Sequence, residues 1–378
     1  MKRQSGLDVL RAVAIVWVML YHASIMGLGS PLPIVAAYGW MGVDLFFVLS
    51  GYLIGTQWLK DVNHDGAFQR FYVRRIFRIL PAYLVVTTIY FALPSLREKP
   101  DMMPLWQFLS FTENWFVDAS KGRAFSHVWS LCVEEHFYLL FPLLSWLLLK
   151  RPSASRTTAL ILTILIAGIV WRAWLWNTGI SVLPEDGPGN LYQRFMEQIY
   201  YPTWTRLDGL LAGVCLALLR VYRPVFWERL MSASGWLTGA AAGLLALAFW
   251  LFREGQVSGN AFIGYPVIAA GFACLLVVSV NDHSWLGRWK VPFASTLALL
   301  AYSLYLTHKM AFKAVRTLGG PWLQNHGVAA VFICALAALL ASGLLYLLVE
   351  RPFLALRDYF SKDQRTSLAT SERLSNLR

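Results

Sequence analysis

The chain has 378 residues, of which 57% are hydrophobic and only 14% are charged. A soluble domain averages about 25% charged residues, so this composition excludes an ordinary soluble protein and indicates a polytopic membrane protein. The formal net charge of +12 does not indicate nucleic-acid binding, because the basic residues lie in short connections between apolar stretches, as membrane topology requires.

Ten apolar segments are long enough, at about 20 residues each, to cross a bilayer as helices. In chain order they cover roughly 7–28, 36–58, 79–97, 128–149, 157–177, 204–222, 236–252, 261–280, 293–316 and 327–349. We therefore predict an all-α polytopic membrane protein of about ten transmembrane helices, with one membrane domain over residues 1–358. Residues 359–378 are polar and are predicted to form a disordered cytoplasmic tail.

The distribution of lysine and arginine predicts the orientation of these spans. With a cytoplasmic N-terminus, the inner connections collect most of the basic residues, whereas the outer connections contain few of them. Cytoplasmic loops carry such an excess of positive charge. Both termini are therefore predicted to be cytoplasmic. The outer connections 98–127 and 178–203 are rich in aromatic residues.

The first span, GLDVLRAVAIVWVMLYHAS, contains Arg11 and His22. Eleven residues at 100° each return almost to the same helix face, so the two side chains share a face about 16 Å apart along the axis. They are too far apart to touch, and we interpret them as the two ends of one path across the membrane. Taken alone, His22 is also compatible with a hydrogen-bonded structural histidine, and Arg11 with a local ion pair to Asp8.

Several other spans place ionisable residues at the depth of His22, in the outer part of the membrane. Unpaired charges in lipid are costly, so this layer predicts a polar cavity that opens outward. Its members are Asp44, Glu134, Glu135, Arg172, Asp208 and His308. An alternative stays open, in which Glu134 or Glu135 pairs with Arg172 or Arg206 only to pack helices. His127 and His136 are the least supported members of this layer.

The inner side of the membrane has a different composition. The stretch FYVRRIFRILP contains Arg74, Arg75 and Arg78, of which Arg74 and Arg78 lie one turn apart on the same face. Guanidinium groups form charge-assisted, fork-shaped bonds to phosphate. The cluster is thus a candidate phosphate site, with topology or anionic lipid headgroups as the alternative. No metal site is predicted, because the four cysteines occur singly in apolar stretches.

Together these motifs resemble the integral-membrane acyltransferase family 3, whose members O-acylate sugars of lipopolysaccharide, exopolysaccharide and related glycans, and some macrolides. The resemblance covers nearly the whole chain to about residue 358, and it departs at His136, where many members have glutamine. The matching residues are Arg11 and His22, GVDLFFVLSGYLI (42–54), FYVRRIFRILPAY (71–83), VWSLCVEEHFYLLFP (128–142), RLDGLLAG (206–213), YSLYLTH (302–308) and VERPF (349–353).

The resemblance implies a ten-helix enzyme in the bacterial cytoplasmic membrane. It implies acyl-CoA, by default acetyl-CoA, as the cytoplasmic donor, and a glycan or glycolipid hydroxyl on the outer side as the acceptor. The family's functional residues map onto three groups of positions in this chain. These are Arg11 with His22, the arginines Arg74, Arg75 and Arg78, and the acidic pair Glu134 and Glu135.

The residues and the resemblance lead to one mechanistic hypothesis. His22 acts as the general base on the acceptor hydroxyl, and Glu134 or Glu135 orients its imidazole. Direct transfer and an acyl-His22 intermediate both stay open. We assign donor binding to Arg11, Arg74, Arg75 and Arg78, and acceptor binding to Asp44, Arg206, Asp208 and His308.

Two alternatives to an enzyme remain at this point. A transporter or flippase of a glycolipid or acylated product would use the same polar cavity, and a structural scaffold would leave that cavity unexplained. The sequence does not indicate which acceptor is used, which acyl group is moved or which oligomeric state forms.

Overall fold

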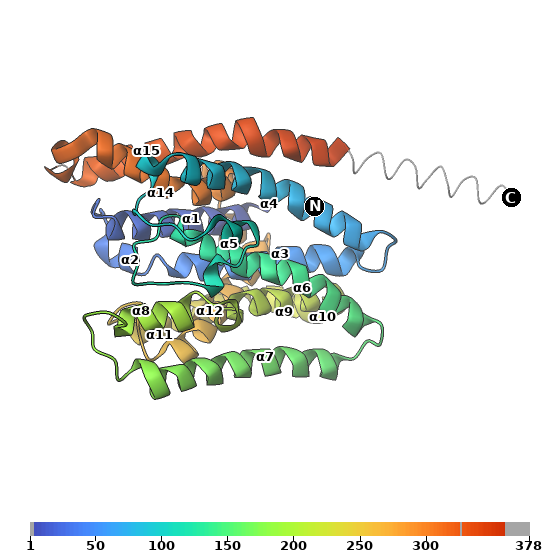
Figure 1. Cartoon of the computed structure of the whole chain (residues 1–378). Helices are drawn as coiled ribbons and strands as arrows, with labels where there is room; N and C mark the ends of the chain where they lie inside the picture. Colours follow the sequence, from blue (N-terminus) through green and yellow to red (C-terminus); the bar gives the residue numbers. More distant parts are fainter. Residues whose placement is uncertain (1–3, 326, 360–378) are drawn as a thin grey trace.

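The computed structural model describes residues 4–325 and 327–359, and these residues contain helices and loops but no β-strand. The long helices run side by side (Figure 1), with α7 (Ala154–Leu175) and α15 (Gly327–Leu345) at opposite edges of the view. Between them lie α1 (Ser5–Ile25) and α3 (Met41–Asp61), both largely buried. The all-α class is therefore confirmed. The predicted tail falls outside the described residues, apart from residue 359.

A helix occupies each of the ten predicted segments. Eight described helices are long and apolar enough to cross a membrane, or nine if α9 and α10, which meet at a bend of 115°, form one span. Besides α1, α3, α7 and α15, the α-helices of the described residues are α2 (Pro33–Ala37), α4 (Ala67–Ala92), α5 (Leu105–Leu109), α6 (Trp129–Leu149), α8 (Leu191–Phe195), α9 (Asp208–Tyr222), α10 (Pro224–Ser232), α11 (Ser234–Leu251), α12 (Ala261–Val280), α13 (Trp285–Arg288) and α14 (Ala294–Asn325).

Two helices depart from a simple span. Helix α9 has only 15 residues, so it reaches about 22 Å and is shorter than the hydrocarbon core. Helix α14 carries His308 and Lys309 near its middle, and its path is broken at Gly320, whose φ of 47° is not helical. The prediction of about ten crossings is thus supported for eight or nine of them.

Helix α4 begins at Ala67 rather than near residue 79. The stretch AFQRFYVRRIFR extends the helix at its N-terminal end as an amphipathic segment, which has too many arginines to be predicted as part of an apolar span. Gly66 lies in the left-handed region, with φ of 71°, immediately before the first residue of α4. Arg74, Arg75 and Arg78 therefore project from within a continuous helix.

Glycines bring α3 and α9 into close contact. A Cβ atom at Gly51 would lie 2.1 Å from the carbonyl oxygen of Leu210, and one at Gly213 would lie 2.3 Å from that of Val48. Small residues allow helix backbones to approach each other in membranes, where the hydrophobic effect does not drive association. This contact aligns the N-terminal ends of the two helices.

We expect Gly51→Ala to destabilise the protein by about 1–3 kcal/mol, because a backbone carbonyl blocks the new methyl group. The measurement is the midpoint of thermal unfolding in detergent. Gly243→Ala in α11 is the matched control, since its Cβ would meet nothing within 4 Å. Equal midpoints for the two variants would contradict the close contact.

Candidate functional site

Two histidines that lie 286 positions apart in the chain are in direct contact. His22 lies near the C-terminal end of α1, and His308 lies near the middle of α14, which packs against α1. His22 Nδ1 is 2.7 Å from His308 Nε2, and the two rings are stacked with centroids 4.9 Å apart. Both side chains are buried. The structure thus joins two residues that the sequence places at the same depth.

The hydrogen-bond partners determine which nitrogens of this neutral pair carry protons. His308 Nδ1 is 2.9 Å from the carbonyl oxygen of Leu304, which can only accept, so His308 Nδ1 carries the hydrogen. His308 Nε2 is then the acceptor, and His22 Nδ1 must donate to it. His22 Nε2 is left with an unprotonated lone pair.

The side chains of Glu134 and Glu135, on α6, point away from His22. They do not orient its ring, contrary to prediction. The hydroxyl of Tyr138 donates to Glu134 Oε2 at 3.1 Å. Glu135 and Arg75 line a cavity of about 200 Å³ between α4 and α6. These glutamates miss His22 because they point toward α3 and α4, and the orienting position at His22 Nδ1 belongs to His308.

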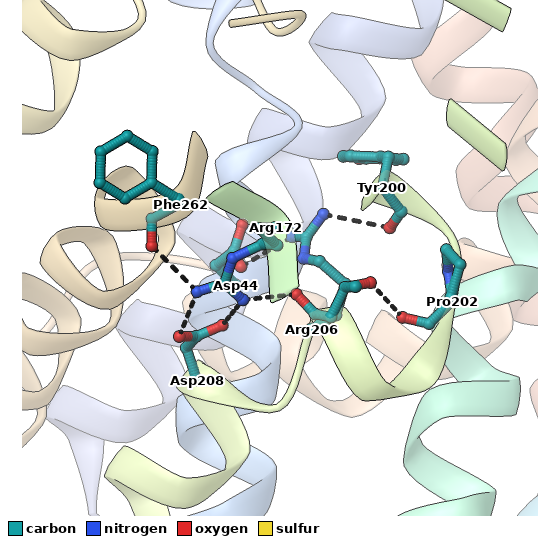
Figure 2. Close-up of polar contacts among 8 residues, drawn as sticks. Asp44, Arg172, Tyr200, Pro202, Arg206, Asp208 and Phe262 are labelled. Atoms are coloured by element: carbon teal, nitrogen blue, oxygen red, sulfur yellow. Dashed lines mark hydrogen bonds and ion pairs between the residues drawn. The ribbon is translucent and has the colours of Figure 1, made fainter. Parts of the chain in front are cut away.

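Asp44, Arg206, Arg172 and Asp208 form two buried ion pairs (Figure 2). Arg172 donates to both oxygens of Asp208, at 2.8 and 3.0 Å, and Arg206 donates to Asp44 at 2.8 Å. Arg206 also lies over the ring of Tyr265, 4.0 Å from its centroid. The alternative that Glu134 or Glu135 pairs with these arginines is therefore wrong. The geometry does not support acceptor binding by Asp44, Arg206 or Asp208, because their charged groups are buried against each other.

Two of the inner arginines also have carboxylate partners. Arg74 Nη1 is 3.6 Å from Asp61 Oδ2, and Arg78 forms an ion pair with Glu350. Glu350 is buried and also accepts a hydrogen bond of 2.7 Å from Ser303 of α14. The side chains of Arg74 and Arg78 remain 23% and 30% exposed. Their guanidinium groups are thus held in place while part of each remains accessible.

The other two predicted donor-binding residues, Arg11 and Arg75, lie on α1 and α4. Arg11 of α1 is 37% exposed, and its Nη1 is 3.9 Å from Asp8 Oδ1. Arg75 of α4 faces the cavity that Glu135 lines, and its Nη2 donates a long hydrogen bond of 3.5 Å to Gln57. The four arginines therefore each have different polar partners, and three of them lie within five residues of α4.

Buried ion pairs hold segment 98–126, which is predicted to lie on the outer side. Lys309 of α14 donates from Nζ to Ser126 Oγ at 3.0 Å and lies 3.5 Å from Glu98. Within the segment, Arg123 pairs with Glu113, and both side chains are buried. Burial raises the pKa of Glu113 to about 7, although Arg123 and Lys309 act in the opposite direction. The segment is thus attached to α14 next to His308.

Three residues at or near the site received no specific role from the sequence. Lys309 was detectable as a charge within an apolar span, and Glu350 as an acid at the end of the last span. His127 comes just before α6, in the turn Ser126–Val128. It sits beside His22 and His308, which agrees with the predicted layer of ionisable residues, in which the sequence gives His127 and His136 the least support.

The chain is similar to known proteins over most of its length. A family model described as an acyltransferase domain matches residues 4–347. The Putative O-acetyltransferase SAS0844 of Staphylococcus aureus (strain MSSA476) is 27% identical over 379 residues, which cover 93% of this chain and 58% of that protein. O-acetyltransferase OatA of Staphylococcus aureus (strain NCTC 8325 / PS 47) is 27% identical over 327 residues, which cover 80% and 49%. The chain spans about half the length of these curated relatives. No solved structure matches it significantly.

We expect Asp208→Leu to destabilise the protein by about 3–5 kcal/mol, because it leaves Arg172 buried without its carboxylate. The double variant Arg172→Met with Asp208→Leu should recover most of this loss, since it removes both charges. Thermal unfolding in detergent measures both effects. A single variant that unfolds like the wild type and only binds its substrate less tightly would instead support the acceptor-binding role.

Proposed function

The chain belongs to the acyltransferase domain family, and on this basis we propose that it is a membrane O-acyltransferase. The proposed reaction moves an acyl group, by default acetyl, from acyl-CoA to a hydroxyl of a glycan. We place the enzyme in the bacterial inner membrane, with both termini and the donor on the cytoplasmic side. A lipopolysaccharide, an exopolysaccharide or a lipid-linked precursor is the expected acceptor.

The observation that carries this proposal is the hydrogen-bond chain through the two histidines. It begins at the Leu304 carbonyl, passes through His308 and ends with a bond to His22 Nδ1. His308 thereby does for His22 what the carboxylate does in a catalytic triad, since it fixes the tautomer and orients the ring. The free lone pair at His22 Nε2 is what a general base requires.

The protons and bonds of the reaction balance through His22 alone. His22 Nε2 takes the proton from the acceptor hydroxyl as that oxygen bonds to the thioester carbon. The C–S bond then breaks, and the imidazolium returns the proton to the departing thiolate, so the products are an ester and free CoA. Leu304 cannot accept a proton from His308, so the extra proton remains within the His22–His308 pair and returns through His22 Nε2 to the thiolate.

Donor binding is proposed for the arginines on the inner side. Arg74 and Arg78 keep part of their guanidinium surface accessible while carboxylates hold them. Such preorganised guanidinium groups suit the phosphates of a nucleotide. Arg11 and His22 are about 16 Å apart along one helix face, a separation that the long, thin pantetheine arm can bridge. Arg75 lines the cavity between α4 and α6.

Acceptor binding is proposed for the outer side, near segment 98–126. Trp106, Trp115 and Phe116 in this segment are each about half exposed. Exposed aromatic faces of this kind pack well against the apolar faces of sugar rings. The names of the similar Staphylococcus aureus proteins support O-acetyl transfer as the chemistry.

We expect His22→Gln to lower acyl transfer by about 10²–10⁴-fold, because glutamine cannot accept the proton. The assay follows free CoA and labelled ester in membranes supplied with labelled acetyl-CoA and envelope glycan. His283→Gln, which changes an exposed histidine after α12, is the control and should retain full activity. Unchanged turnover in a stably inserted His22→Gln protein would refute the assignment. A transporter would release no CoA in either the presence or the absence of acceptor.

We expect Arg74→Gln to raise the KM for acetyl-CoA by roughly 10-fold or more, which is the value of one charge-assisted hydrogen bond. The effect on kcat should be smaller, because Arg74 is distant from the transferred group in this mechanism. Arg156→Gln is the control, since it removes an exposed arginine at the start of α7. A KM that is the same in both variants would favour the alternative in which these arginines only set the membrane topology and do not bind the donor.

A further inference from the structure

We propose that His127 is a catalytic residue that donates a hydrogen bond to the carbonyl oxygen of the acyl group as negative charge develops there. This inference rests on the proposed acyl transfer, and it adds a third histidine to the pair formed by His22 and His308. It assigns the stabilising role to a residue in the turn that leads into α6.

The first observation is position. The ring centroid of His127 lies 5.0 Å from that of His308 and 5.8 Å from that of His22. The three histidines come from three elements, the turn Ser126–Val128, α14 and α1. His127 is 2% exposed. Its imidazole therefore lies directly beside the proposed base and its orienting partner.

The second observation is that neither ring nitrogen of His127 forms a hydrogen bond of good geometry among the described residues, although both are buried and the backbone of Tyr305 and Leu306 lies close to the ring. Leaving a buried polar group unpaired costs about 1–3 kcal/mol. By contrast, the bonds to His308 and Leu304 satisfy every nitrogen of the His22–His308 pair except the basic one. A neutral imidazole always carries one N–H, so His127 offers an unused donor beside the base.

The third observation is that the backbone around His127 is held from several sides. The Tyr305 hydroxyl donates to the His127 carbonyl at 2.7 Å, and Lys309 donates to the preceding Ser126. Glu98 accepts from the backbone N–H of Phe125 at 2.9 Å. Phe125 itself has φ of 57°, a conformation that a bulky side chain rarely adopts. These contacts fix the turn, whereas the His127 side chain that it presents forms no hydrogen bond of good geometry among the described residues.

Such an arrangement fits the requirement for stabilising an oxyanion. A donor that is already in place, in a site without water, stabilises developing charge without any cost of reorganisation. During attack of the acceptor oxygen, the carbonyl electron pair moves to oxygen, and the His127 N–H donates to it. When the C–S bond breaks, the pair returns to the carbonyl. His127 keeps the same protons throughout, so the proton balance at His22 is unchanged.

The test compares His127→Phe with His127→Gln in the acyl-transfer assay and in thermal unfolding. Phenylalanine removes two unpaired buried nitrogens, so the unfolding midpoint should stay the same or rise. The kcat should fall by about 10²–10³-fold with little change in the KM for the donor, as for loss of one oxyanion donor. Glutamine keeps an N–H group and should recover at least part of the lost kcat. Thr56→Val removes another buried, unpartnered polar atom and should leave kcat unchanged.

Two results would overturn the inference. One is wild-type kcat in His127→Phe. The other is an equal loss of kcat in both His127 variants together with a lower unfolding midpoint, which a purely structural histidine would give. His22→Gln, measured alongside, separates this inference from the proposed function. If His22→Gln is inactive while His127→Phe is fully active, only the role of His127 fails. If His22→Gln is active, the proposed acyl-transfer mechanism itself fails.

Discussion

The cost of burying a polar group away from water determines how the ionisable side chains of this protein are arranged. Two ion pairs offset this cost, one between Arg172 and Asp208 and one between Arg206 and Asp44. These pairs connect α3, α7 and the start of α9. His22 and His308 offset this cost with a hydrogen bond that continues to a backbone carbonyl. Among the three neighbouring histidines, only His22 Nε2 and the His127 ring nitrogens keep hydrogen-bonding capacity that no contact of good geometry uses. We therefore place the chemistry at the free nitrogen of His22 and at the His127 ring.

A considerable part of the fold was predictable from the sequence. Each of the ten apolar segments contains a helix, and the angular spacing of Arg11 and His22 follows from helix geometry alone. The start of α4 was missed because FQRFYVRRIFR is amphipathic, and a search for apolar residues stops where the arginines begin. The predicted segment 204–222 ends where α9 ends but begins too early, because residues Thr203–Thr205 form a separate 3-10 turn before α9 starts at Asp208.

The sequence predicted which residues belong to the site better than it predicted which of them contact one another. The position of a residue along a helix gives its depth, which is why His22 and His308 could be assigned to one layer. Depth does not reveal which face of a helix meets which neighbour. For this reason Glu134 and Glu135 were expected beside His22, whereas they face α3 and α4. His127 lies before the first turn of α6, where neither hydropathy nor helical spacing marks a residue as part of a buried site.

Adjacent positions on α14 serve two different parts of the molecule. His308 contacts α1, and the next residue, Lys309, is bound to Ser126 and Glu98 of the outer segment. Segment 98–126 is therefore tied to α14 one residue from His308, and the chain continues from Ser126 directly into His127. A displacement of this segment would consequently move His127 and pull on the helix turn that orients His22, so the position of the segment and the geometry of the three histidines are mechanically coupled.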